Sequence, residues 1–117
     1  MKYNMFQNVP AVNMTPEVQR KLLAYQPTAG DDKGYTINFM QAKAGAAAPP
    51  HSHPHLQVVY ILSGGGDFLC GEETQTVKPG DVIQIDANVP HTFAVIPEDT
   101  TWLEFFTPER EDYNPNV

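Results

Sequence analysis

Glycine and proline divide this chain into short segments, and that division constrains the fold more than any other feature. The sequence contains eleven prolines and eight glycines in 117 residues, and the apolar runs between them are short. Runs of this length fit β-strands, whereas a helix needs about 10–12 uninterrupted residues. The spacing therefore favours an antiparallel sandwich or barrel over a bundle of helices.

The expected strands can be placed from alternation and from β-branched or aromatic content. Residues 35–40 alternate in the manner of a half-buried strand. Further strand-like runs, bounded by turn residues, lie at residues 57–62, 68–70, 74–77, 82–85, 91–96 and 101–107. We predict an all-β fold in a single domain that covers residues 1–117, with a closed or sandwiched antiparallel sheet. The charged tail (108–117) is expected to lie over the surface.

The segment at residues 15–25 has two interpretations. Thr15 followed by Pro16 is typical of a helix start, with the threonine as cap and the proline in the first turn. Val18, Leu22 and Ala24 also alternate with their neighbours well enough for a strand. The surrounding strands favour the second interpretation, but the pattern alone leaves both open.

Composition narrows the class of protein. Apolar residues make up 41% of the chain, which is too many for a disordered segment, and the net charge of −7 argues against a nucleic-acid backbone binder. Cys70 is the only cysteine, so no disulfide can form within the chain. Neither a signal peptide nor a membrane-spanning run is visible. We therefore expect a cytoplasmic protein that binds neither nucleic acid nor membrane.

The four histidines occur in only two places, at His51, His53 and His55 and at His91. In an extended chain, side chains an even number of residues apart lie on the same face. His51 and His53 therefore share a face, and Gln57 belongs to the same set. Imidazole suits divalent transition metals, and glutamine adds a neutral oxygen. Scattered surface histidines are the alternative interpretation. A His-x-His pair together with a distant histidine favours a metal site.

These residues resemble the two motifs of the cupin family. The first is Gly45-x5-His51-x-His53-x3-Gln57-x6-Gly64, and the second is Gly80-Asp81-x4-Asp86-x-Asn88-x2-His91. The resemblance implies a single-domain antiparallel β-barrel of the jelly-roll type, with six to eight strands and its barrel motifs at about 34–107. The mouth of this barrel would hold a metal on His51, His53, Gln57 and His91. Nickel, zinc, iron, manganese and copper all accept such a site.

The chain departs from the cupin motifs at four positions. Gln57 replaces the usual glutamate ligand, Asp86 and Asn88 replace a proline and a glycine, and Val95 replaces an asparagine. Since glutamine cannot titrate, a base beside the metal must come from elsewhere.

A narrower resemblance covers nearly the whole chain. Residues 51–57, 79–81, 88–91 and especially 106–113 are similar to the small pectin-degradation cupins that linearise unsaturated uronates. This resemblance implies an isomerase that opens cyclic 4,5-unsaturated monouronates, left by pectin and alginate lyases, to the linear keto form. It also implies functional groups at Glu104, Phe106 and Arg110. The family motif has aspartate where this chain has Glu104.

Each of these three residues also has a plainer interpretation. Glu104 could transfer protons, or it could face solvent because it alternates with Leu103 and Phe105. Phe106 could form a wall for the sugar or belong to the core. Arg110 could hold the substrate carboxylate or only neutralise its acidic neighbours.

Other functions and partners stay open at this stage. A quercetinase-like dioxygenase would use the same histidines, and a non-catalytic cupin could bind a small ligand or a metal. A homodimer is expected, because cupins commonly pair through sheet edges and an exposed edge strand needs cover. His55 is expected to be a loop residue, and Cys70 a buried wall residue.

Overall fold

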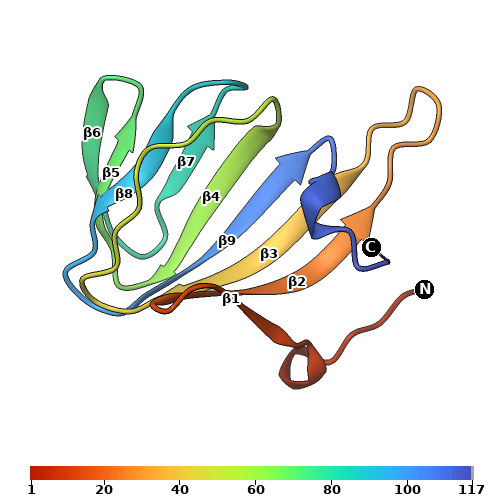
Figure 1. The fold of residues 1–117 in the computed structure, drawn as a ribbon, viewed down its shortest axis with the longest axis horizontal. Helices are drawn as coiled ribbons and strands as arrows, with labels where there is room; N and C mark the ends of the chain where they lie inside the picture. Colours follow the sequence, from red (N-terminus) through yellow and green to blue (C-terminus); the bar gives the residue numbers. More distant parts are fainter. Residues whose placement is uncertain (117) are drawn as a thin grey trace.

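The computed structural model describes residues 1–116, and two facing antiparallel sheets account for most of it (Figure 1). The larger sheet has six strands in the order β1-β2-β3-β9-β4-β7, and the smaller has three in the order β6-β5-β8. The elements are η1 (Phe6–Asn8), β1 (Ala11–Thr15), β2 (Val18–Gln26), β3 (Tyr35–Ala42), β4 (Leu56–Ser63), β5 (Gly66–Cys70), β6 (Glu73–Val77), β7 (Val82–Ile85), β8 (His91–Val95), β9 (Thr100–Thr107) and η2 (Glu111–Tyr113).

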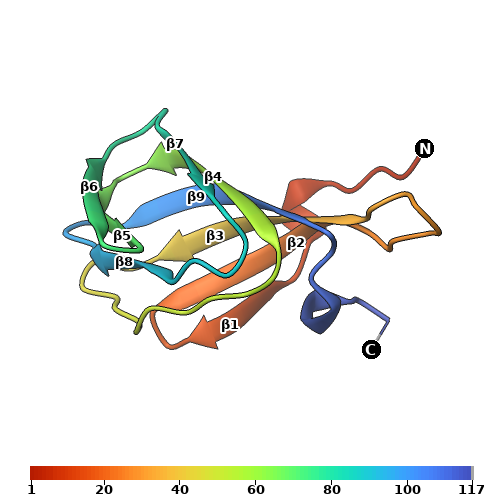
Figure 2. The same ribbon diagram turned by 90° about the horizontal axis from the view of Figure 1, so that it is seen from above.

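This architecture confirms the predicted all-β, jelly-roll-like fold. The two sheets curve around a shared interior without closing into one continuous ring (Figure 2). Residues 1–116 contain nine strands, more than the six to eight that the resemblance implied. The β1–β2 hairpin, which extends one edge of the larger sheet, accounts for the excess.

The ambiguous segment at residues 15–25 is a strand preceded by a tight turn. The Thr15 hydroxyl accepts hydrogen bonds from the backbone N–H groups of Glu17 (3.2 Å) and Val18 (3.1 Å). These are the bonds of a helix cap, but here they close the turn between β1 and β2. The chain then pairs with β3 along the whole of β2, so the strand interpretation is correct.

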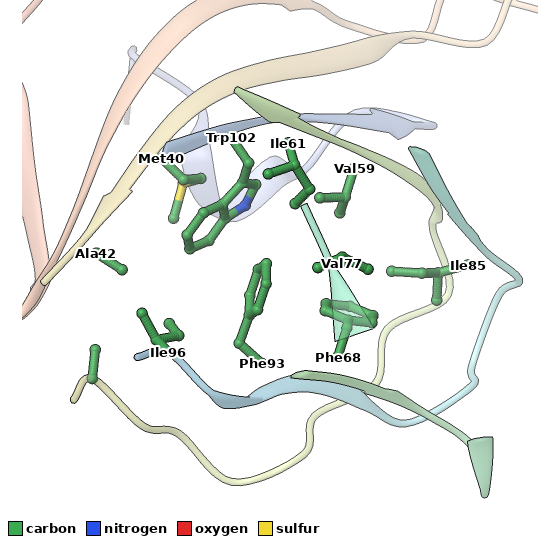
Figure 3. Packing of buried hydrophobic residues seen from close by; sticks show 11 residues of the cluster. Met40, Ala42, Val59, Ile61, Phe68, Val77, Ile85, Phe93, Ile96 and Trp102 are labelled. Carbon is green, nitrogen blue, oxygen red and sulfur yellow. The ribbon is translucent and has the colours of Figure 1, made fainter. Parts of the chain in front are cut away.

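The apolar core lies between the two sheets (Figure 3). The rings of Phe93 and Trp102 meet at its centre, with their centroids 4.7 Å apart. The cluster comprises Met40, Ala42, Ala46, Val59, Ile61, Phe68, Val77, Ile85, Phe93, Ile96 and Trp102.

The inner face of the larger sheet changes from apolar to polar along its strands. One cross-strand row consists of Met40, Trp102 and Ile61 and belongs to the core. The next row, two residues along, places Asn38 beside Glu104. Both are buried although both are polar. The fold therefore builds a polar chamber at one end of its hydrophobic core.

The alternation seen in residues 35–40 is real, but its apolar set does not face the interior. Thr36 and Asn38 are fully buried, while Tyr35 is 44% exposed and Ile37 is half-buried. A half-buried strand normally turns its apolar side inward. Here the polar side faces inward because the chamber is built from it.

Among residues 1–116, no helix is both long and apolar enough to cross a membrane.

Gly64 and Gly80 provide a matched test of how tightly the β4–β5 connection packs. Both have positive φ, 75° at Gly64 and 91° at Gly80. A Cβ at Gly64 would overlap the Asp99 carbonyl oxygen and the Thr100 hydroxyl, whereas a Cβ at Gly80 would meet no atom within 4 Å. Gly80→Ala should lower the free energy of unfolding by about 1–2 kcal/mol, the strain of the left-handed conformation alone. Gly64→Ala adds the overlap, for a total of about 3 kcal/mol or more.

Urea denaturation of the two variants beside the wild type measures these differences. Equal losses for Gly64→Ala and Gly80→Ala would show that the close approach at Gly64 is not rigid.

Candidate metal centre and its cavity

Backbone hydrogen bonds bring the two histidine segments together. His51 and His91 form a reciprocal bridge, with N···O distances of 3.1 and 2.9 Å, and the Asn88 N–H donates to the His53 carbonyl at 2.8 Å. Asn88 adopts φ 67°, a left-handed conformation that asparagine tolerates better than most residues. This conformation explains how asparagine can stand where the cupin motif usually has glycine.

Three of the four histidines in these segments form one group. The potential ligand nitrogens of His51, His53 and His91 all lie within 4.8 Å of one another. Two of the rings also donate to a backbone carbonyl two residues away, which fixes their orientation. The pairs are His53 Nδ1 with His55 (3.2 Å) and His91 Nδ1 with Val89 (2.8 Å). Such bonds are typical of metal-ligating histidines, because they leave the other nitrogen available.

The free acceptors of this group fit a cation. Nδ1 of His91 donates to a carbonyl, so in the neutral ring Nε2 carries the lone pair; that atom is buried and has no partner within residues 1–116. Gln57 is buried too, and its Oε1 lies 2.9 Å from Nε2 of His53. Imidazole nitrogens and an amide oxygen directed at one point suit a divalent transition metal, which would satisfy these lone pairs.

The local electrostatics keep these rings ready to bind a metal. Burial, together with the neighbouring rings of His91 and His53 and the charge of Arg110, lowers the pKa of His51 to about 4. Burial likewise lowers the pKa of His53. Both rings are therefore neutral at pH 7, and a metal need not displace protons from them.

A cavity of about 350 Å³ adjoins the histidines. This is at the lower end of the range for small-molecule pockets, roughly 300–1,000 Å³, and suits a single small ligand better than a polymer. Three predicted metal ligands and all three predicted catalytic residues line it. The lining consists of Met14, Thr15, Val18, Met40, Ala46, Ala47, Ala48, His51, Gln57, Val59, Phe68, His91, Thr92, Phe93, Ile96, Trp102, Glu104, Phe106, Arg110 and Tyr113.

Glu104 is buried, with 6% of its surface exposed, so the solvent-facing interpretation is wrong. Its Oε1 accepts a hydrogen bond from Trp102 Nε1 (2.9 Å), and its Oε2 accepts one from Asn38 Nδ2 (3.4 Å). Burial raises the pKa of this carboxyl, although the two hydrogen bonds and the charges of Arg110 and Arg20 oppose the effect. Glu104 is thus a positioned carboxyl group with a pKa shifted toward neutrality.

The charged tail was expected over the surface, but the structure fixes it at the cavity. Glu109 is buried and accepts a hydrogen bond from the Thr28 N–H at 2.7 Å, while its carbonyl accepts one from His55 Nε2 at 3.1 Å. The Arg110 N–H donates to the Thr36 hydroxyl at 2.9 Å. These bonds anchor the tail, so that Arg110 and Tyr113 become walls of the cavity.

Arg110 and Phe106 pack against each other. The Arg110 guanidinium carbon lies 4.8 Å from the Phe106 ring centroid, and the Phe106 ring meets the His53 ring edge-on at 5.4 Å. Arg110 also pairs with Asp112 through two hydrogen bonds of 3.0 and 2.7 Å. Phe106 is both buried and part of the cavity wall, so its two interpretations are compatible.

Sequence reasoning missed several residues of the cavity. Trp102 and Asn38 hold the Glu104 carboxyl, and Tyr113 lines the cavity from the tail. Trp102 could have been found, because it shares the face of Glu104 two residues away on the same strand. Tyr113 carries no such signal.

Cys70 is half-buried against the core and lies outside the cavity lining. Burial raises the pKa of its thiol.

The fold and the histidine group together define a jelly-roll-type barrel with a candidate metal centre at its mouth. The family model of the cupin domain matches residues 38–106. The chain therefore belongs to the cupin family.

Two solved structures share this fold, and one relative matches nearly the whole chain by sequence. The structure of KdgF from Halomonas sp. has a TM-score of 0.84 at 22% identity, covering 96% of this chain and 97% of that one. The polyketide cyclase RemF from Streptomyces resistomycificus has a TM-score of 0.76 at 24% identity, covering 95% and 82%. The pectin degradation protein KdgF of Dickeya dadantii is 23% identical over 113 residues, which are 96% of this chain and 97% of the relative.

Removal of the metal tests the histidine group. We predict that the metal-free protein binds one divalent transition ion and gains about 2.7 kcal/mol of unfolding free energy at 100 times the dissociation constant. His91→Ala should abolish both effects, because it deletes the buried unpaired nitrogen. His55→Ala should retain binding, because His55 lies outside the group of three.

Metal content by mass spectrometry and urea denaturation with and without metal measure these effects. Retention of a full equivalent of metal by His91→Ala would contradict the assignment.

Proposed function

We propose that this chain is a metal-dependent isomerase that opens cyclic 4,5-unsaturated monouronates, produced by pectin or alginate breakdown, to their linear keto form. The observation that carries the proposal is Glu104. Among the described residues that line the cavity, it is the only one with a carboxyl group. It supplies the acid–base group that Gln57 cannot, since an amide does not titrate.

The reaction needs one proton to be moved within the substrate. Ionised Glu104 takes the proton of the anomeric hydroxyl; the carbonyl forms at C1 as the bond from C1 to the ring oxygen breaks. The ring oxygen is left as an enolate on C5. Glu104 then returns its proton to C4, and C5 becomes a ketone. The formula of the sugar does not change, so no oxidant or other co-reactant is required.

The environment of Glu104 suits this exchange. A carboxyl group that both accepts and donates a proton works best when its pKa lies near the ambient pH, and burial shifts that of Glu104 in this direction. The Trp102 and Asn38 bonds hold the group in place. A bound divalent metal would supply a Lewis acid that polarises a sugar oxygen.

Arg110 and Phe106 would position the substrate. The Arg110 guanidinium can attract the uronate carboxylate into a protein whose net charge would otherwise repel it. The Phe106 ring offers an apolar wall next to the histidines. The likeness to KdgF over 96% of this chain supports the proposal, because that relative is named for pectin degradation.

Loss of the ultraviolet absorbance of unsaturated galacturonate measures the reaction. The metal-loaded protein should accelerate this loss over buffer, and chelation should abolish the acceleration. Glu104→Gln should lower kcat by about 10²–10⁴-fold, the usual contribution of a general acid–base, without loss of metal.

Two further variants serve as controls. Glu98→Gln removes an exposed carboxyl at the turn before β9 and should leave kcat unchanged. Glu104→Asp restores the residue of the family motif and should stay active. If the metal-loaded wild type is no faster than buffer, the proposal fails.

We also propose that two copies pair through the outer face of the larger sheet rather than through a sheet edge. The outward positions of β3, β4, β7 and β9 carry no charged residue among those described. They are Tyr35, Ile37, Phe39, Gln41, Leu56, Val58, Tyr60, Leu62, Val82, Gln84, Thr101, Leu103, Phe105 and Thr107. Exposed apolar side chains include Leu56 at 51% and Phe105 at 37%. An uncharged face lets copies of an acidic chain associate without mutual repulsion.

Light scattering of the purified chain tests this pairing. The wild type should have the mass of a dimer at micromolar concentration, and Phe105→Asp should be a monomer because it buries a charge at the centre of the face. Val95→Asp places the same charge at a more exposed position on the smaller sheet, 49% against 37% for Phe105, and should remain dimeric. A monomeric wild type would refute the proposal.

A further inference from the structure

Arg20 forms no ion pair with an acidic residue among those described, although its charge acts on the buried Glu104 carboxyl. It pairs across the sheet with Met40 and lies two residues from Val18, and both of those neighbours line the cavity. Since alternate residues of a strand share a face, Arg20 belongs to the inner face of the larger sheet. Its neighbour Lys21 points the other way, donating to the Phe6 carbonyl outside the sheet at 3.2 Å.

The hydrogen bonding of Arg20 is incomplete. Its Nε is buried and has no partner within residues 1–116, and no ion pair joins its guanidinium to a carboxylate of those residues. Arg110, in contrast, is held by both oxygens of Asp112. Acidic residues outnumber basic ones by 14 to 7 in this chain. An unpaired inner-face arginine in such a chain is unfavourable unless a ligand supplies the acceptor.

Aromatic contacts connect Arg20 to the rest of the site. Its guanidinium carbon lies 4.3 Å from the ring centroid of Tyr113, and that of Arg110 lies 4.6 Å from the same ring. Arg110 in turn contacts Phe106, whose ring meets that of His53. A continuous column of rings and guanidinium groups thus leads from Arg20 to the candidate metal centre. Figure 1 and Figure 2 both show η2, which carries Tyr113, beside β2.

We propose that Arg20 is a specificity-determining residue that binds the carboxylate of the substrate where its neighbours Val18 and Met40 line the cavity. A planar guanidinium with an unpaired Nε–H can donate two parallel hydrogen bonds to a carboxylate. The Arg110 fork is held by Asp112, so Arg110 contributes the positive charge that attracts the acid, while Arg20 keeps a free donor with which to bind the carboxylate itself. Stacking on Tyr113 holds the fork in orientation without using its donors.

The identity of the acid that Arg20 binds rests on the proposed function. The existence of an anion site at Arg20 does not. The competing explanation is that Arg20 only supports Tyr113 and thereby the tail. A supporting role would affect charged and uncharged ligands equally. A carboxylate-binding role affects only the charged ones.

The experiment compares Arg20→Gln with Lys21→Gln, which removes the same charge from the opposite face of the same strand. With the unsaturated uronate as substrate, Arg20→Gln should raise KM by about 10- to 100-fold and leave kcat within about 3-fold, since a hydrogen bond to a charged group is lost. Lys21→Gln should change neither. Arg20→Lys, which keeps the charge but loses the fork, should be intermediate.

Calorimetric titration with galacturonate and with its methyl ester provides the second readout. Arg20→Gln should weaken binding of the acid by a similar factor and leave binding of the ester unchanged. Two results would overturn the role of Arg20: equal weakening of the binding of both ligands, or an unchanged KM and an unchanged affinity for the acid. The proposed function would still hold in either case if the wild type turned over the uronate. Binding of galacturonate that depends on Arg20 without turnover by the wild type would refute the proposed function and support the anion site.

Discussion

The reciprocal backbone bridge between His51 and His91 is the constraint on which the site depends. The segment carrying His51 and His53 lies in the long connection between β3 and β4, while His91 begins β8 of the other sheet. Two backbone hydrogen bonds join them, so the side chains converge without needing a metal to gather them. The orientation of the His53 and His91 rings is set in the same way, by backbone carbonyls. The chain therefore presents a preformed set of nitrogen ligands, and the proposed chemistry follows from that preorganisation.

The polar chamber explains why the larger sheet has an unusual pattern on both faces. Its inner positions near the site carry Asn38, Gln57 and Glu104, which need hydrogen-bond partners because they are buried. The apolar side chains of the same strands, such as Leu103 and Phe105, then face outward and remain partly exposed. Polarity inside and hydrophobicity outside are thus two consequences of one alternation.

Much of this could be predicted from the sequence, and the successes share a physical basis. Strand positions follow from turn residues and alternation, and the histidine group follows from the period of two combined with the distant His91. The inward direction of Glu104 could not be read from its apolar neighbours, because alternation fixes which residues share a face but not which face is buried. The tail was missed for a different reason. The bonds that anchor Glu109 and Arg110 join them to Thr28 and Thr36, far away in the chain.

X-ray absorption spectroscopy of the metal-loaded protein tests the central claim most directly, because it reports the ligands themselves. The account predicts a first shell at about 2.0–2.2 Å made only of nitrogen and oxygen, with the outer-shell scattering of three imidazole rings. Gln57→Ala should keep all three imidazoles and lose one oxygen. A first shell containing sulfur, or scattering from fewer than three imidazoles in the wild type, would contradict convergence of His51, His53 and His91 on one cation.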